Sequence, residues 1–211
     1  MNTMKDKARE LLMEMDFQPH DCIYEIEEAI QDKGFNVRMG EGASKNCIIL
    51  KDYDFVIKWT SYPDMGRPDP TVQEANIYNR ACDSGVGGFF PKTVYLGTYK
   101  GCPMVAQEKI DFSAQRVPRD RIDDYIRITR TVNRSTVKKM QTCFNKACGK
   151  RGYSRILDKM WASMVVSLYG KRAAKALCDF LIRENINDLH ESNIGYKNNR
   201  PVILDFCGYD G

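Results

Sequence analysis

Three polar residues near the end of the sequence have the types and the spacing that phosphoryl transfer to a hydroxyl requires. Asp188 is followed five residues later by Asn193, and the apolar run Val202–Leu204 then leads directly to Asp205. In such a reaction one acid orients the acceptor hydroxyl, while a carboxamide and a second acid hold a divalent metal ion. We therefore expect Asp188 to orient the acceptor, and Asn193 and Asp205 to bind metal.

These residues resemble the catalytic loop and the metal-binding loop of the protein-kinase-like superfamily. Ile186-Asn187 stands in place of the usual His-Arg, and His190 follows the catalytic aspartate as it does in aminoglycoside-type and minimal bacterial or bacteriophage kinases. The resemblance covers about residues 35–209. In size and truncation the chain looks most like the minimal kinases of type III secretion effectors and bacteriophage early proteins. Because the sequence ends at Gly211, we expect no activation segment.

A lysine and a glutamate further upstream match the residues with which this family holds nucleotide phosphates. Glu74 is the only acidic residue between Thr71 and Cys82, and it follows Lys58 by sixteen residues. A lysine at the end of an apolar strand is usually a solvated edge residue, and a glutamate near a helix start favours the helix dipole. The occurrence of both ahead of Asp188 favours the kinase-type pair, in which Glu74 orients Lys58.

Two further stretches resemble the nucleotide-contacting parts of the family. Gly40-Glu41-Gly42-Ala43-Ser44-Lys45 resembles a shortened glycine-rich loop, in which backbone N–H groups approach phosphates closely, with Lys45 replacing the third glycine. Two glycines in a hairpin are otherwise most often a turn. Met104–Ile110 resembles the fifth strand and hinge, with Gln107 as gatekeeper. The resemblance implies ATP and Mg²⁺ as cofactors and nucleotide contacts from Gly40, Gly42, Ser44, Lys45, Lys58, Glu108 and Ile110.

The elements that would position these residues follow from hydrophobic periodicity. In the first half it predicts helices at 3–15 and 71–82 and a further helix that begins at an N-cap at Asp21 and ends at Gly34. Strands are predicted at 35–39, 47–50, 55–59, 94–97, 104–108 and 202–204. Further helices are predicted at 119–130, 132–148, 153–168 and 171–184. No strand is predicted between Asp111 and Val202. A strand-rich half followed by a helical half is typical of an α+β protein.

The resemblance makes that fold more specific. It implies a bilobal kinase-like fold, with a small antiparallel N-lobe sheet that carries one αC-type helix and with a mostly helical, truncated C-lobe. The expected parts are a helical N-terminal extension at 1–34, an N-lobe at 35–110 and a C-lobe at 111–211.

Positive charge is concentrated in one part of the chain. The net charge is +4, but residues 116–175 hold 16 Lys/Arg against 4 Asp/Glu. Arg127, Arg130, Arg134 and Lys138 would share one face of a helix, which is ordinarily a solvated face. The excess favours an anionic partner. Because the aromatic residues are not interleaved with the basic ones as in a single-strand nucleic-acid binder, we favour an acidic protein surface, with nucleic acid as the second alternative.

Composition places the chain among globular proteins. Of its 211 residues 43% are hydrophobic, and no apolar run reaches membrane-spanning length. The first fifteen residues mix charges rather than forming an apolar signal core. The 8 cysteines form no CxxC pair, as expected for thiols in a reducing compartment. We therefore expect a cytoplasmic protein without membrane contact, in a bacterial cell or, for an effector, in a host cell.

The leading hypothesis is an ATP-dependent phosphotransferase of the minimal protein-kinase type. It would transfer the γ-phosphate to Ser or Thr of a protein. His190 keeps an aminoglycoside-type small-molecule kinase as an alternative. Lys45 and Cys207, which replace motif glycines, keep a second alternative from another class: a pseudokinase that binds a partner through its basic helical lobe.

Overall fold

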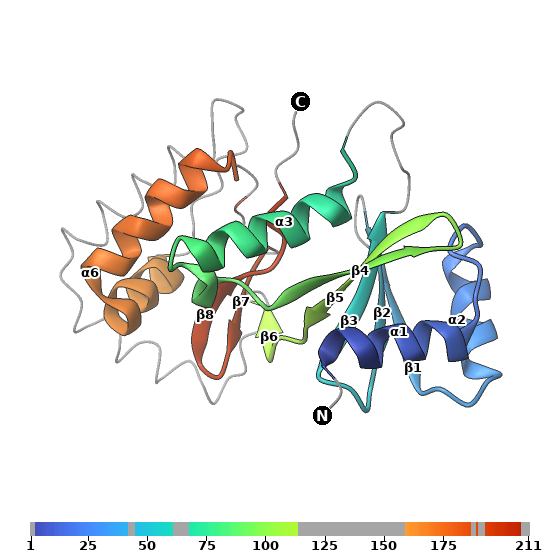
Figure 1. Ribbon diagram of the computed structural model, residues 1–211. Coiled ribbons are helices and arrows are strands. Elements are labelled where there is room, and N and C mark those ends of the chain that lie inside the picture. Colours follow the sequence, from blue (N-terminus) through green and yellow to red (C-terminus); the bar gives the residue numbers. More distant parts are fainter. Residues whose placement is uncertain are drawn as a thin grey trace. The chain divides into compact units, whose positions relative to one another are not determined.

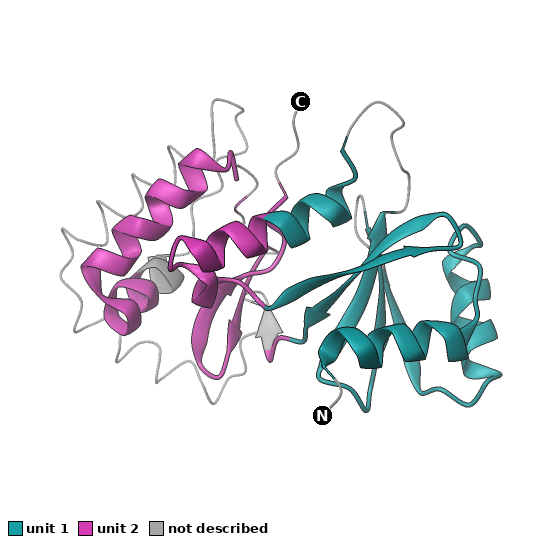
Figure 2. Cartoon of the chain, viewed as in Figure 1, with its two compact units in different colours: residues 1–76, 92–109 teal, residues 77–91, 110–211 magenta. Residues whose placement is uncertain are grey.

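The computed structural model describes residues 3–41, 45–60, 68–113, 159–186, 189 and 193–207. The chain is an α+β protein whose largest element of structure is a five-stranded antiparallel sheet (Figure 1). It divides into two compact units (Figure 2). The first comprises residues 1–76 and 92–109, and the second comprises residues 77–91 and 110–211.

The first unit contains the sheet and the helices nearest the N-terminus. Its elements are α1 (Met4–Met15), α2 (Ile23–Gln31), β1 (Val37–Glu41), β2 (Lys45–Leu50), β3 (Phe55–Thr60), the first turns of α3 (Pro70–Asp83), β4 (Thr93–Tyr99) and β5 (Cys102–Glu108). The strand order is β1-β2-β3-β5-β4, and every neighbouring pair is antiparallel. The helices and strands expected for this region are thereby confirmed, with ends that differ by up to three residues.

One helix start differs from the expectation. The N-cap of α2 is Cys22 and not Asp21. Glu25, in the first turn, reaches back so that one of its carboxylate oxygens accepts the Cys22 N–H at 3.1 Å. A glutamate at this position satisfies a backbone donor at the helix start, so an aspartate cap is not needed.

One face of the sheet is apolar and packs against α1 and α2. Ile48, Ile57 and Trp59 point to this side and have no exposed surface. Trp59 also donates its indole N–H to the Pro19 carbonyl at 3.1 Å, which fixes the segment between the two helices. On the far edge, Arg9 of α1 donates to the Leu96 carbonyl of β4 at 2.7 Å. These contacts make the N-terminal helices part of the core of the first unit.

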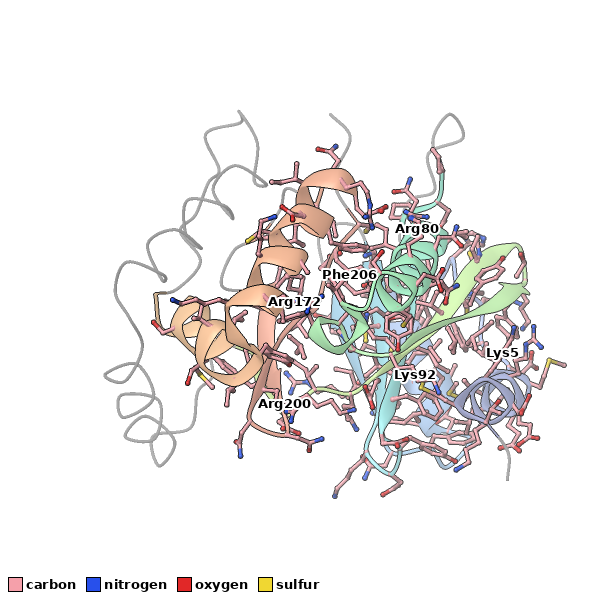
Figure 3. All side chains as sticks on the ribbon, turned by 60° about the vertical axis from the view of Figure 1, so that its left-hand side comes forward. Lys5, Arg80, Lys92, Arg172, Arg200 and Phe206 are labelled. Atoms are coloured by element: carbon pink, nitrogen blue, oxygen red, sulfur yellow. The ribbon has the colours of Figure 1, made fainter. Side chains whose placement is uncertain are left out.

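The second unit contains the end of α3, the 3-10 turn η1 (Gly87–Phe89), β6 (Phe112–Ser113), α6 (Lys159–Arg183), β7 (Ile194–Lys197) and β8 (Arg200–Ile203). Its core includes Phe90 and Phe206, whose ring centroids lie 4.9 Å apart (Phe206 is labelled in Figure 3). Arg80 in α3 forms an ion pair with Glu184 at 2.7 Å. Gly170 interrupts α6 with φ 81° and ψ 165°, where the sequence predicts a break.

The strands of this unit correct the sequence-based expectation. β6, β7 and β8 form an antiparallel sheet in that order, whereas only a strand at 202–204 was predicted. β7 is short and contains Gly195, so it has little strand character by itself, and it forms because it pairs with β8. The helices predicted at 119–130 and 132–148 lie outside the described residues. Of the helices that the structure describes, none is both long and apolar enough to cross a membrane.

Candidate functional site

The second face of the five-stranded sheet is polar. Strand register places Lys45 opposite Thr60 and Cys47 opposite Lys58 on this face, and Gln107 of β5 lies beside Thr93 of β4. Residues directly opposite each other in an antiparallel pair point to the same side, so these side chains share one surface. Most of them are buried: Lys45 is 7% exposed, Gln107 3%, and Thr93 has no exposed surface.

Two polar contacts fix the first turn of α3 on the polar side of the sheet. The Asp69 carboxylate caps the helix, accepting the Thr71 N–H at 2.7 Å and the Val72 N–H at 3.2 Å. The hydroxyl of Thr71 lies 2.9 Å from the hydroxyl of Thr60 at the end of β3. With its start held in this way, α3 places Glu74, one turn later, against the polar face.

Glu74 is the centre of the site. Its carboxylate has no exposed surface. One oxygen, Oε2, accepts a hydrogen bond from Lys45 Nζ at 3.1 Å, and the other, Oε1, accepts one from the Gln107 amide at 3.0 Å. Lys58 Nζ lies 3.6 Å from Oε1 as an ion pair. The Gln107 amide also donates to the Thr93 hydroxyl at 3.1 Å, so a side chain of β4 helps to hold the β5 side chain that bonds to Glu74.

Among the residues that the structure describes, the cluster carries an excess of positive charge. Two lysines face one carboxylate, and the lysine farther from that carboxylate, Lys58, is also the more exposed, at 16% against 7% for Lys45. A buried charge is tolerated only when it is paired and hydrogen-bonded. Glu74 meets this condition fully. The surplus cation, at a partly accessible position, is suited to a negatively charged ligand.

Cys47 lies opposite Lys58 on the neighbouring strand, and the charged cluster and burial affect the pKa of its thiol. Burial raises the pKa of its thiol to about 11, although the nearby Lys58 ammonium acts in the opposite direction. The thiol is therefore protonated at neutral pH and is a poor nucleophile there. This position has the properties of a small packing residue beside the charged cluster.

The remaining nucleotide-contacting residues expected from the sequence are placed as follows. Gly40 is in β1 opposite Cys47, and a Cβ there would meet its neighbours at 3.6 Å, an ordinary contact, so the fold does not itself require glycine. Glu108 ends β5, where its backbone N–H donates to the Lys92 carbonyl at 2.8 Å. Ile110 is half-buried in the second unit. Gly42 and Ser44 lie outside the described residues.

The two expected metal ligands flank one end of the β7–β8 hairpin in the second unit. Asn193 precedes β7, and its carbonyl accepts the Leu204 N–H at 2.8 Å just after the end of β8, which brings Asp205, the next residue, close to Asn193. Both side chains are half-buried. The Cys207 thiol lies 3.5 Å from Oδ1 of Asp205. Asp188 lies outside the described residues, as do His190 and the basic residues Arg127, Arg130, Arg134 and Lys138.

The residues that the structure brings together are thus Lys45, Lys58 and Glu74 in one unit, and Asn193 and Asp205 in the other. Sequence patterns did not indicate that Gln107, which also donates to Thr93, holds Glu74, because this contact depends on which strands are neighbours. Within the described part of the chain, no three His, Cys, Asp or Glu side chains are grouped so that they could hold a metal ion.

The described residues therefore define an α+β protein with a buried, positively charged Lys/Glu cluster on one face of an antiparallel sheet. Comparisons of the chain with protein-family models, with curated proteins and with solved structures found no match.

Proposed function

We propose that this chain is an ATP-dependent phosphotransferase of the protein-kinase type, acting on Ser or Thr of a protein. The observation that carries the proposal is the pair formed by Lys58 and the fully buried Glu74, with 3.6 Å between Nζ and Oε1. Glu74 holds the lysine in place, and the lysine ammonium binds the α- and β-phosphates of ATP. A cluster with one surplus positive charge suits a polyphosphate.

The donor chemistry of the β7–β8 hairpin end fits Mg²⁺. This ion prefers oxygen ligands and is commonly held by one or two carboxylates together with substrate phosphates. Asn193 offers a carboxamide oxygen and Asp205 a carboxylate, and the hydrogen bond from the Leu204 N–H to the Asn193 carbonyl keeps the two positions close. When bound, the ion would neutralise phosphate charge. Asp188 takes the role of orienting the acceptor hydroxyl.

The proposal includes a kinase-like bilobal fold. The first unit would be the nucleotide lobe, because it contains Lys58, Glu74 and the residues that support them. The second unit would supply the acid and the metal ligands. The cytoplasm, of a bacterial cell or of a host cell, is the compartment that suits an ATP-dependent enzyme with this composition.

Nucleotide binding and transfer test the proposal together. Mg-ATP at a hundredfold excess over Kd should stabilise the native protein by about 2.7 kcal/mol and raise its melting temperature. Lys58→Met should strongly reduce this shift, and it should abolish the transfer of labelled phosphate to proteins of a cell extract. Asp188→Ala should abolish transfer but retain the shift. Lys51→Met, which alters an exposed lysine in the turn before β3, is the matched control and should behave as the parent does.

Each failure has a distinct meaning. If Mg-ATP leaves the melting curve of the parent unchanged, the nucleotide site is refuted. If the parent binds Mg-ATP but transfers phosphate to no acceptor, including aminoglycosides, the enzyme assignment is wrong and the pseudokinase replaces it.

A second candidate function, a partner-binding pseudokinase, is favoured by the charge of residues 116–175, with 16 Lys/Arg against 4 Asp/Glu. An acidic protein is the partner that we infer, with nucleic acid as the alternative. Reversal of Arg127, Arg130, Arg134 and Lys138 to Glu should then weaken capture of the partner but not Mg-ATP binding. Capture should also decline with added salt, since exposed charges are screened over about 8 Å at physiological ionic strength. Equal capture by the parent and the reversed protein would exclude this surface.

A further inference from the structure

The two lysines of the cluster do not contact Glu74 equally. Lys45 Nζ lies 3.1 Å from Oε2 with hydrogen-bonding geometry, whereas Lys58 Nζ lies 3.6 Å from Oε1, beyond the usual length of a charge-assisted hydrogen bond. Oε1 already accepts the Gln107 amide at 3.0 Å. Each oxygen of Glu74 is therefore held by a donor other than Lys58.

The two lysines also differ in how far their side chains are buried. Lys45 and Gln107, which hydrogen-bond to Glu74, are 7% and 3% exposed, and Glu74 has no exposed surface. Lys58 is more than twice as exposed as Lys45. The two lysines are on adjacent strands of one sheet face, with Lys45 at the start of β2 and Lys58 across from Cys47. The Lys45 side chain is thus enclosed with the carboxylate, and the Lys58 ammonium is at the accessible side.

We propose that Lys45 is a positioning residue that, together with Gln107, holds and neutralises Glu74, and thereby leaves the Lys58 ammonium to bind the phosphates of the nucleotide. This inference rests on the proposed function, and it divides between two lysines a task that the resemblance assigns to one. Glu74 and Lys45 form the neutral pair, so Lys58 carries the surplus charge that an anion balances.

The first test needs no nucleotide. In a double-mutant cycle of urea unfolding, Lys45→Met, Glu74→Gln and their combination report the coupling between the two side chains. We expect a coupling of about tenfold or more in the unfolding equilibrium constant, and a smaller one in the same cycle with Lys58→Met. A coupling equal to or smaller than that of Lys58 would overturn the assignment of Lys45.

The second test measures Mg-ATP affinity by titration calorimetry. Lys58→Met should raise Kd by about 10- to 150-fold, as expected for loss of a hydrogen bond to a charged group. Lys45→Met removes the hydrogen bond to Glu74 and should raise Kd by less than about tenfold, and Lys45→Arg, which retains the charge, should restore most of that loss. If Lys45→Met does not fold, Lys45→Gln, which is polar but uncharged, takes its place in both measurements with the same expected outcomes.

The outcomes separate this inference from the proposed function. A loss in Lys45→Met as large as that in Lys58→Met would mean that Lys45 contacts phosphate itself, and the inference fails while the function stands. A parent that does not bind Mg-ATP overturns the function and the role of Lys58, and the unfolding cycle then reports independently whether Lys45 holds Glu74.

Discussion

Replacing Glu74 by Gln removes one negative charge from the centre of the cluster and changes almost nothing in volume. The new amide oxygen can still accept a hydrogen bond from Gln107, as Oε1 of Glu74 does at 3.0 Å. The amide nitrogen, a donor, would face one of the two ammonium groups. Lys45 and Lys58, both largely buried, would then lose the carboxylate with which each of them pairs.

The expected cost follows from the distances. At an effective dielectric constant of about 20, a unit charge pair separated as Lys45 and Glu74 are, at 3.1 Å, attracts by about 5 kcal/mol, and the 3.6 Å pair with Lys58 by about 5 kcal/mol. Desolvation and the repulsion between the lysines offset much of this sum. Removal of one partner from a buried pair costs about 3–5 kcal/mol, and we expect Glu74→Gln to fall in that range.

Thermal unfolding followed by circular dichroism measures this effect. For a chain of this size, 1 kcal/mol shifts the melting temperature by about 2–4 °C, so Glu74→Gln should melt about 6–20 °C below the parent. Glu28→Gln makes the same chemical change on the exposed side of α2 and should cost no more than about 0.5 kcal/mol. If the two variants unfold within about 1 kcal/mol of each other, Glu74 is not the counter-charge of a buried cluster.

Three further predictions concern other parts of the structure. Trp59→Phe should cost about 1–3 kcal/mol in urea unfolding, because the Pro19 carbonyl loses the indole donor at 3.1 Å; no loss would show that water replaces it. Since burial raises the Cys47 pKa to about 11, only about one thiol in a thousand is ionised at pH 8, and alkylation of the folded protein at Cys47 should accelerate about tenfold per pH unit up to that value; a plateau below pH 9 would contradict this. Gly170→Ala should lower the free energy of unfolding by about 1–3 kcal/mol, measured by thermal unfolding, because φ 81° with ψ 165° is accessible essentially only to glycine. The control Gly88→Ala, with no positive φ and open space around the residue, should be nearly neutral, and equal effects of the two substitutions would show that the backbone conformation of Gly170 does not require glycine.

Most elements of the first unit were predictable from the sequence because their signals are local. Apolar residues recur at helical spacing in α1 and α3, and short apolar runs separated by polar turns mark β2, β3 and β5. β7 was missed because four residues that include a glycine carry no strand pattern. The better signal was the turn after it, where Asn198 and Asn199 adopt φ of 48° and 61°, as a two-residue hairpin requires.

The candidate site was only partly predictable for a related reason. The spacing of Lys58 and Glu74 and the family resemblance suggested a pair, and the structure places their charged atoms 3.6 Å apart. Lys45 was expected in a loop, but β2 begins at this residue, two positions earlier than the apolar run, and register then directs its side chain to Glu74. Gln107 was expected as a gatekeeper. Its contact with Glu74 depends on strands distant in sequence, which periodicity cannot reveal.

The N-terminal helices are synthesised well before the strands against which they pack. Arg9 can donate to the Leu96 carbonyl only after the 87 residues that follow Arg9 have been synthesised. Phe17 likewise can pack against Tyr99 only after Tyr99 has been synthesised; in the folded protein the centroids of their rings are 5.4 Å apart. At about 5–20 residues per second, synthesis of that stretch takes about 4–17 s. For those seconds the apolar side of α1 lacks the β4–β5 hairpin that helps to bury it, so nascent-chain chaperones should bind the first helix. The first unit closes only after residues 92–109 have left the ribosome.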